Sequence, residues 1–175
     1  MKIKIKLFDG QTMPEIISKG DWIDIKANQD IEIKGPDIEH TTTRSGTEKH
    51  KVSFNNAMIP LGFSAKLPNG FEAHLLPRSS SYKKTKTILA NQQGIIDQSY
   101  CGDGDQWYYN AVALGTCHIK KGDKIGQFRI QLSQKATFWQ KLKWLFSSKI
   151  ELVQVDHLDN KDRGGFGSTD SKEIK

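Results

Sequence analysis

The sequence predicts an all-β protein, a barrel or a sandwich, and three observations predict this fold class. Several short runs alternate between aliphatic and polar residues, which is the period-two pattern of a half-buried strand. Gly, Pro, Asn and Asp punctuate these runs at short intervals and so predict turns. A helical pattern is confined to one segment near residue 140. Many short strands joined by turns are typical of barrels and sandwiches.

The first strand is expected at residues 2–8, where Ile3, Ile5 and Leu7 share one face and lysines share the other. Asp9-Gly10 predicts the turn that ends this strand. Alternation or apolar runs predict further strands at residues 21–25, 30–34, 71–76, 107–114, 124–132 and 150–155, with a hairpin at residues 94–97.

A short extra helix is expected near residues 137–147, because apolar residues there recur at helical spacing. The stripe consists of Phe138, Leu142, Leu145 and Phe146. Trp144 lies off it and spoils strict amphipathicity. The favoured interpretation is a helix that packs on its own barrel through this stripe. The alternative is a docking surface for a partner or a membrane.

Two segments depart from the barrel pattern. Residues 36–53 are polar and predict either a long loop or an extended hairpin. After His157 the chain becomes polar and glycine-rich, which indicates a mobile arm. We therefore expect one domain over residues 1–160, with insertions at about 36–53 and 137–148, and a mobile C-terminal lid arm over residues 161–175.

Composition narrows the partners. The chain has 175 residues and a formal charge of +6, which favours nucleic acids, nucleotides or phosphates, although a mildly basic surface without a partner is equally compatible. Cys101 and Cys117 form no C-x-x-C pair, so we expect free thiols in a reducing compartment. No apolar run has the length of a membrane span or the form of a signal peptide. We expect a cytoplasmic protein without a membrane partner.

The C-terminal arm carries the strongest candidate ligand-binding run. Glycines that include Gly167 let the backbone N–H groups approach anionic oxygens closely. Arg163 adds a planar donor fork that suits phosphate. Ser168 and Thr169 add hydroxyls, and Phe166 could stack on a base. The alternative is a flexible Gly/Ser tail without a ligand.

A second run follows a predicted strand. Arg78 with the neighbouring hydroxyls of Ser79 and Ser80 could clamp an oxyanion, although a plain Ser-rich turn is the simpler interpretation. Gln127 could donate to a phosphate or could simply be a strand residue.

Residues 91–100 form the third run. A glycine hairpin that includes Asn91, Gly94 and Ile96 can expose backbone groups to the edge of a base. Asp97 follows two aliphatic residues and could be a partly shielded carboxylate, hence a general base for water. Tyr100 could pack its ring on a sugar. The alternative is a β-turn with a structural Asp and a core Tyr.

Protein-held metal sites find little support. Asp103-Gly-Asp105 lacks the rest of a calcium-loop pattern, so we interpret it as a turn. The histidines show no zinc spacing, and no H-x-E with a downstream C-x-x-C exists, which argues against a zinc nucleobase deaminase.

Taken together and in order, these runs resemble the five motifs of the homotrimeric dUTP pyrophosphatases (dUTPases). The resemblance is nearest to the Bacillus and Bacillus-phage branch, through Gly-Asp-Trp-Ile-Asp at residues 20–24 and Glu-Ala-His at residues 72–74. It covers nearly the whole chain except about 36–53 and 137–148. Five motifs in the correct order and spacing are highly specific.

The resemblance implies a jelly-roll-like β-barrel, the β-clip dUTPase fold, assembled as a homotrimer with three active sites at subunit interfaces. The implied reaction is hydrolysis of dUTP to dUMP and diphosphate, with Mg²⁺ as cofactor. Asp97 would activate the attacking water, and Tyr100 would stack on the deoxyribose. Asn91, Gly94 and Ile96 would read uracil.

The remaining motif residues would handle the triphosphate. Asp24 would support the site near Mg²⁺ through water. The phosphates would be held by Arg78, Ser79, Ser80 and Gln127. The arm residues that would close over uracil and the γ-phosphate are Arg163, Phe166, Gly167, Ser168 and Thr169. This division agrees with the chemistry, because cleaving a phosphoanhydride is mainly positioning and charge stabilisation.

Two departures and two alternatives accompany the resemblance. Asp170 stands where the family often has glycine, and Trp22 replaces the usual glycine of the first motif. The first alternative is a dCTP deaminase-type relative of the same fold. The second is a phage regulatory protein that binds a repressor through its insertions. We do not expect direct binding to nucleic acid. We do expect a phage or prophage source.

Overall fold

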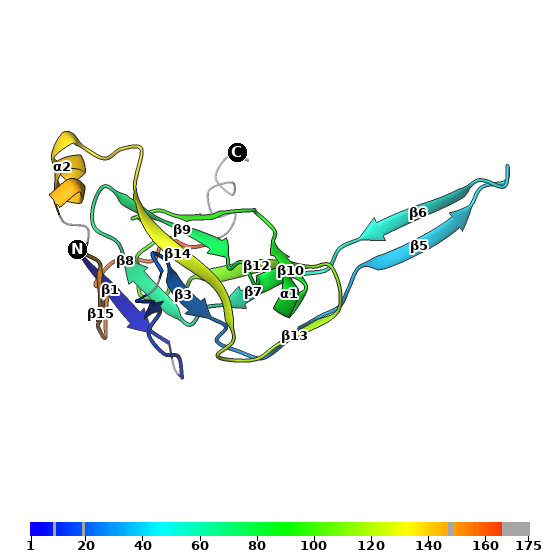
Figure 1. The fold of residues 1–175 in the computed structure, drawn as a ribbon, viewed down its shortest axis with the longest axis horizontal. Coiled ribbons are helices and arrows are strands. Elements are labelled where there is room, and N and C mark those ends of the chain that lie inside the picture. Colours follow the sequence, from blue (N-terminus) through cyan, green and yellow to red (C-terminus); the bar gives the residue numbers. More distant parts are fainter. Residues whose placement is uncertain (9, 19, 147–148, 166–175) are drawn as a thin grey trace.

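The computed structural model describes residues 1–8, 10–18, 20–146 and 149–165, and it confirms the all-β prediction. Within these residues the chain forms fifteen strands and two short helices (Figure 1). The helices are α1 (Ser81–Thr85) and α2 (Phe138–Phe146). The strands are β1 (Lys2–Leu7), β2 (Glu15–Ile16), β3 (Ile23–Lys26), β4 (Ile31–Ile33), β5 (Asp37–Thr42), β6 (Glu48–Ser53), β7 (Asn56–Pro60), β8 (Phe63–Lys66), β9 (Phe71–Pro77), β10 (Thr87–Leu89), β11 (Gly94–Ile96), β12 (Tyr108–Ala113), β13 (Cys117–Ile119), β14 (Lys124–Leu132) and β15 (Glu151–Gln154).

Three sheets enclose the core. The largest has the strand order β11-β9-β14-β3-β2, and two three-stranded sheets have the orders β15-β1-β8 and β10-β12-β7. β1 pairs in parallel with β15 and antiparallel with β8, so the two ends of the barrel chain lie side by side. Short ribbons, β13-β4 and β5-β6, complete the described strands.

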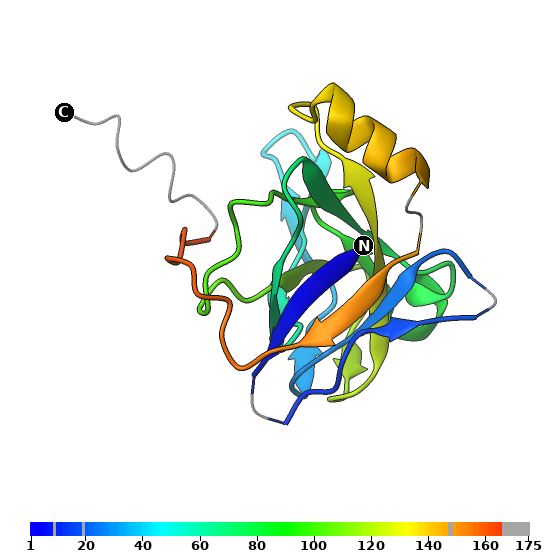
Figure 2. The same cartoon turned by 90° about the vertical axis from the view of Figure 1, so that its left-hand side faces the viewer.

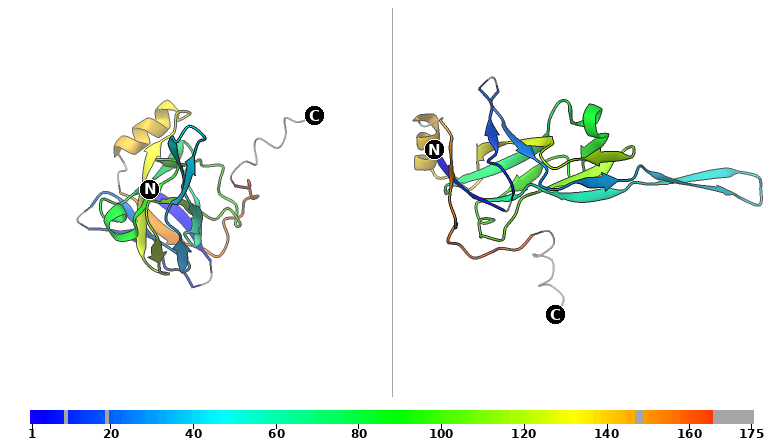
Figure 3. Two further views of the ribbon diagram at one scale, coloured as in Figure 1. Left: turned by 90° about the vertical axis from the view of Figure 1, so that its right-hand side faces the viewer. Right: turned by 90° about the horizontal axis from the view of Figure 1, so that it is seen from below.

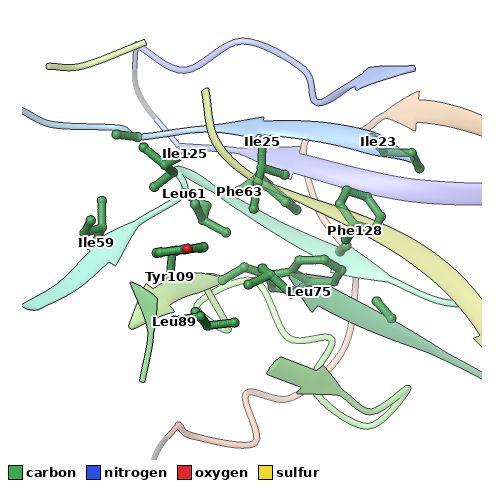
Figure 4. Close-up of a cluster of buried hydrophobic side chains, with 14 of the residues drawn as sticks. Ile23, Ile25, Ile59, Leu61, Phe63, Leu75, Leu89, Tyr109, Ile125 and Phe128 are labelled. Carbon is green, nitrogen blue, oxygen red and sulfur yellow. The ribbon is translucent and has the colours of Figure 1, made fainter. Parts of the chain in front are cut away.

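The core forms because each strand places alternate side chains inward. In β9, Phe71, Ala73 and Leu75 are buried, whereas the residues between them are partly exposed. Inward residues from the sheets meet in one cluster, part of which Figure 4 shows. At its centre the Trp107 ring lies 5.0 Å from Phe63 and 5.1 Å from Phe128, centroid to centroid. Such tilted aromatic contacts add to the free energy gained from burial.

The strand predictions hold best where the alternation is regular. Ile3 and Ile5 are fully buried as expected, and Leu7 is half-buried. β14 has the predicted bounds. The expected Ser-rich turn is present at Ser79 and Ser80, and helix α1 follows it directly. The hydroxyl of the buried Ser81 accepts from the Arg78 amide at 2.9 Å and donates to the Ile125 carbonyl at 3.0 Å, which holds the start of α1 against β14.

Residues 36–53 form the extended hairpin rather than the long loop. β5 and β6 pair antiparallel from Asp37↔Ser53 to Thr42↔Glu48, and every residue of both strands is exposed. The ribbon projects far from the barrel (Figures 1 and 3). Because no other element covers it, the hairpin contributes nothing to the core.

Helix α2 exists as predicted, but the favoured packing of its stripe is wrong. Phe138, Leu145 and Phe146 are strongly exposed, and Figure 2 shows the helix on the outside of the barrel. The side that faces the barrel carries Trp144, whose ring lies 5.3 Å from that of Phe71. No helix within the described residues is long and apolar enough to span a membrane.

Candidate active site

A pocket of about 270 Å³ lies between the ends of β9, β11 and β12 and the last described part of the chain. Six residues that the sequence singled out line it together, namely Asn91, Gly94, Ile96, Asp97, Tyr100 and Arg163. The arm glycines Gly164 and Gly165 line it too, and Gln106, Tyr108 and Asn110 are lining residues that the sequence did not single out. The pocket therefore joins the third motif run to the beginning of the C-terminal arm.

The floor of the pocket is the turn that leads into β11. The Ala90 amide donates to the Asn110 carbonyl at 2.8 Å, which fixes the start of the turn on β12. Gln92 takes a positive φ of 58°, and Gly94 pairs with Leu75 of β9. A Cβ at Gly94 would lie 3.3 Å from the Leu75 Cβ, so glycine lets the two strands approach closely. The backbone of this turn consequently faces the pocket without a side chain at residue 94.

Asp97 is more accessible than the sequence suggests. Its side chain is 54% exposed, so the expectation of a partly shielded carboxylate is wrong for the single chain. Asp97 lies just beyond the end of β11. Its described partner is Arg163, whose Nη1 lies 3.0 Å from Oδ2. An accessible carboxylate beside a pocket can reach a water molecule directly.

Tyr100 contributes a neutral phenol to the pocket wall. Burial, followed by the nearby charge of Asp105, raises the pKa of Tyr100 to about 12. The phenol therefore stays protonated at neutral pH and donates to the Gln106 carbonyl at 2.8 Å. This hydrogen bond fixes the ring beside the pocket, where it can pack on a flat or cyclic ligand group.

The run at residues 103–105 is a turn, as predicted, but its carboxylates have a further role that the sequence did not reveal. Asp105 is buried and accepts from three backbone amides, those of Gly102 at 2.8 Å, Arg163 at 3.0 Å and Gly164 at 3.1 Å. These bonds hold the beginning of the arm beside the pocket and so place the Arg163 guanidinium near Asp97. Arg163 lies 58 positions after Asp105 in the chain, so only the folded structure shows that the two residues are in contact.

The glycines of this turn make room for the incoming segment. A Cβ at Gly102 would lie 2.2 Å from the Asp162 carboxylate, and one at Gly104 would lie 2.4 Å from it. The Gly104 amide donates to that carboxylate at 2.7 Å. Larger residues at either position would push the arm away from the pocket.

Asp103 holds the segment that precedes the arm. It accepts from the Leu158 amide at 2.6 Å and contacts the His157 ring at 2.7 Å. The hydrogen bond from Leu158 and then that from His157 lower the pKa of Asp103 below its ordinary value. Lys6 of β1 lies 3.7 Å away and adds a third stabilising contact.

Of the expected phosphate residues, Arg78 belongs to a separate charged cluster outside this pocket. Asp24 is 1% exposed, and its two oxygens pair with Arg78 Nε at 3.0 Å and with Lys124 Nζ at 3.1 Å. Lys124 also pairs with Glu15 at 2.7 Å. The hydrogen bonds to Glu15 and then Asp24 raise the pKa of Lys124, and Lys124 lowers the pKa of Glu15. We call these four residues the Asp24 cluster.

The remaining expected donors lie beside the Asp24 cluster. Gln127 is opposite Asp24 in the β3–β14 ladder, and its amide donates to the Pro77 carbonyl at 3.2 Å. Ser79 is exposed, and Ser80 stands at the N-cap of α1 without a side-chain capping bond. Both residues follow Arg78 directly in the chain.

This geometry leaves two predictions untested, the role of the arm residues beyond Gly165 and the binding of Mg²⁺. Phe166, Gly167, Ser168, Thr169 and Asp170 lie outside the described residues. Among the described residues, no group of three or more His, Cys, Asp or Glu side chains could hold a metal ion.

Comparison with known proteins places the chain in a family. The sequence profile of the dUTPase family matches residues 47–171. A curated relative, the SPbeta prophage-derived deoxyuridine 5'-triphosphate nucleotidohydrolase YosS of Bacillus subtilis, is 40% identical over 173 residues, which cover 98% of this chain and all of the relative.

The chain belongs to the dUTPase family.

Solved dUTPase structures confirm the fold. The dUTPase from Streptococcus mutans superposes with a TM-score of 0.60 at 17% identity, over 77% of this chain and 98% of its own. A mutant of the Staphylococcus bacteriophage 80alpha dUTPase, solved with dUpNHpp, gives a TM-score of 0.57 at 18% identity, over 95% of this chain and 97% of its own. The barrel is therefore the jelly-roll-like β-clip that the resemblance implied.

Proposed function

We propose that this dUTPase-family protein hydrolyses dUTP to dUMP and diphosphate, by attack of water on the α-phosphate. The observation that carries the proposal is the single pocket in which an accessible carboxylate, a neutral phenol, a backbone turn and an arginine meet. These groups match what the reaction needs, since phosphoanhydride cleavage depends on positioning and on stabilised charge.

The turn before β11 is the proposed reader of uracil. Backbone amide and carbonyl groups at residues 91–96 can pair with the donor and acceptor edge of the base, and Asn91 adds a side-chain amide. The close approach of Gly94 to β9 supports a narrow slot, which would exclude the methyl group of thymine. Tyr100 would pack on the sugar and leave no room for a 2′-hydroxyl.

Asp97 is the proposed general base. Its exposure supports direct access to water, and Arg163 beside it supplies a guanidinium that can turn from the carboxylate to a phosphate oxygen. Binding of the triphosphate would thus draw Arg163 toward the nucleotide and release Asp97 for proton transfer. The arm residues beyond Gly165 would close over the site in the same step.

Mg²⁺ fits the donor set as a cofactor that arrives mainly on the nucleotide. This ion prefers phosphate oxygens and water to a cage built from protein side chains. Asp24 is already paired with Arg78 and Lys124, which fits contact through water rather than direct ligation. When bound, Mg²⁺ neutralises charge on the triphosphate.

A homotrimer would bring the separated residues together. Arg78, Ser79, Ser80 and Gln127 do not line the pocket of their own chain, so we propose that they hold the phosphates of a nucleotide bound in a neighbouring subunit's pocket. The mass in solution tests this directly, because a monomer that retains full activity would contradict it. The free cysteines support a reducing compartment, which would be the bacterial cytoplasm.

The deciding experiment measures diphosphate release from dUTP, with dTTP, dCTP and UTP as controls. We expect release from dUTP alone. Ammonia release from dCTP would instead support a deaminase of the same fold.

The projecting hairpin supports a second role as a regulatory surface. β5 and β6 carry exposed apolar residues, Ile38 and Val52, at positions that the pocket does not use. We propose that a partner such as a phage repressor binds this ribbon. A variant without residues 36–53 that still binds the repressor would contradict the proposal.

A further inference from the structure

Helix α2 presents a row of large apolar side chains to solvent. Phe138, Trp139, Leu145 and Phe146 are between 66% and 86% exposed, and we call them the α2 ridge. Monomeric proteins seldom expose contiguous large apolar groups unless these groups contact something else. We propose that the α2 ridge binds the surface of a membrane that contains anionic lipids.

The ridge cannot turn inward, because the opposite side of α2 is already fixed. Trp144 packs on Phe71 at 5.3 Å between ring centroids. Gln140 lies against Gly70, where any Cβ would come within 2.4 Å of the Gln140 side chain, and its Oε1 accepts from the Thr137 amide at 2.7 Å. With about 3.6 residues per turn, these inward residues lie opposite Phe138 and Phe146. The exposure of the ridge is therefore built into the fold.

Charge on the flanks favours an anionic lipid surface. Lys141 and Lys143 lie on the two sides of the ridge, and Lys135 and Lys149 lie before and after the helix, all of them exposed. Residues 133–150 contain no Asp or Glu. An apolar face bordered on both sides by lysine is typical of helices that lie in the plane of a bilayer interface, where phenylalanine and tryptophan enter the headgroup region and lysine contacts anionic lipid.

Other occupants agree less well with these observations. A two-fold dimer that paired the ridge with its own copy would bring the flanking lysines of the two helices together, and like charges repel. Nucleic acid would pair with the lysines but would leave the ridge in contact with polar phosphates. The ridge has no acidic residue beside it in residues 133–150, so an anionic surface fits its charge. This inference changes the earlier expectation of no membrane partner, and it does not depend on the proposed reaction.

Vesicle flotation tests the proposal with the full chain. We expect the protein to float with vesicles of phosphatidylglycerol and phosphatidylcholine in equal amounts, and to float much less with phosphatidylcholine alone. Replacing Trp139 and Phe146 with serine should reduce partitioning into the mixed vesicles by about a hundredfold, since each of the two buried apolar side chains contributes about a tenfold factor. Replacing Lys141 and Lys143 with glutamate should remove the preference for the anionic lipid.

A control uses an exposed apolar pair on another element, the projecting hairpin. Ile38→Ser with Val52→Ser on the hairpin also removes exposed apolar surface, far from α2, and this variant should float like the wild type (Figure 1). All variants change exposed side chains, so dUTP turnover in lipid-free buffer and the thermal midpoint should stay at wild-type values. Turnover in solution thus tests the reaction separately from lipid binding.

Three flotation results would overturn the proposal. They are wild-type protein that stays with the unbound fraction, equal flotation of the serine variant of the ridge, and equal binding to neutral and anionic vesicles. A change of solution mass in the Trp139 and Phe146 variant would also overturn it, because the ridge would then be an interface between copies of this chain. Capture by a protein partner that vesicles do not displace would have the same consequence.

Discussion

The pocket and the Asp24 cluster hold their carboxylates in opposite ways. Asp97 in the pocket is 54% exposed and is paired with Arg163 from the end of the described chain. Asp24 is 1% exposed and is held by two cations on neighbouring strands and turns. A buried charge must be paired in the folded protein, whereas an exposed one can exchange its partner for water or ligand. The cluster is therefore set by folding, and the pocket stays open to change on binding.

The largest effect should follow from neutralising the open carboxylate. Asp97→Asn should lower the turnover of dUTP by about 10²–10⁴-fold, because a positioned general base contributes about that much. Nucleotide binding should persist, since the turn and Tyr100 remain. Diphosphate release and calorimetric binding of dUTP check the two parts. Unchanged turnover would remove Asp97 from the role of base.

Removing the partner of that carboxylate should have the next largest effect. Deletion of residues 163–175 should raise the barrier by several kcal/mol, which is about two orders of magnitude or more in kcat. The barrel should stay folded, because its core lies elsewhere. Steady-state kinetics and the circular dichroism spectrum measure the two properties. A truncated protein with wild-type rates would contradict the lid.

The Asp24 cluster should respond in stability as well as in binding. Arg78→Gln removes one partner of a buried carboxylate and should cost about 1–3 kcal/mol of unfolding free energy, with Lys124 as the remaining partner. The KM for dUTP should rise at least about tenfold if Arg78 also holds a phosphate. Urea titrations and kinetics provide the data, and Arg44→Gln on the exposed hairpin is the matched control. If both the unfolding free energy and the KM for dUTP stayed at wild-type values, Arg78 would neither stabilise Asp24 nor hold a phosphate.

Acid should weaken the attachment of the arm in a predictable direction. The folded-state pKa of Asp103 is lowered, so its contribution to stability is complete above the ordinary value of 3.8 and is lost as pH falls through the lowered pKa. The Asp103→Asn variant should therefore melt below the wild type at neutral pH, and the difference should narrow at pH values under 3.8. Thermal melts of the wild type and the variant, from neutral pH to below 3.8, measure this difference in melting temperature. A difference that widens in acid would show that the hydrogen bond to Leu158 is not the cause.

The smallest effect on catalysis should come from the projecting hairpin. Deletion of residues 36–53 should leave dUTP turnover nearly intact, since every residue of β5 and β6 is exposed and none lines the pocket. The measurement is kcat/KM for dUTP of the variant without residues 36–53, compared with that of the wild type. A large loss would make the hairpin part of the enzyme.

Much of the fold and half of the candidate site could be predicted from the sequence. Regular alternation in β1 and β14 fixed which side chains point inward, because the side-chain period of a strand does not depend on its partners. The run from Asn91 to Tyr100 is local, so its residues enter one pocket wherever the hairpin is placed. The order of the motifs resembles that of the dUTPases, and this resemblance predicted which residues outside the pocket hold the phosphates.

Only the tertiary structure decided which contacts join distant segments. The periodicity of α2 predicted a helix correctly but assigned the wrong face to the barrel. An apolar stripe shows on which side of a helix the apolar residues lie, but it does not show whether another element packs against that side. The sequence likewise could not show that Asp105 would receive the amides of Arg163 and Gly164, because that contact depends on how the chain returns after β15. Local patterns determined the elements and the motif chemistry, and long-range packing determined which carboxylate is buried, which is open and which apolar face remains uncovered.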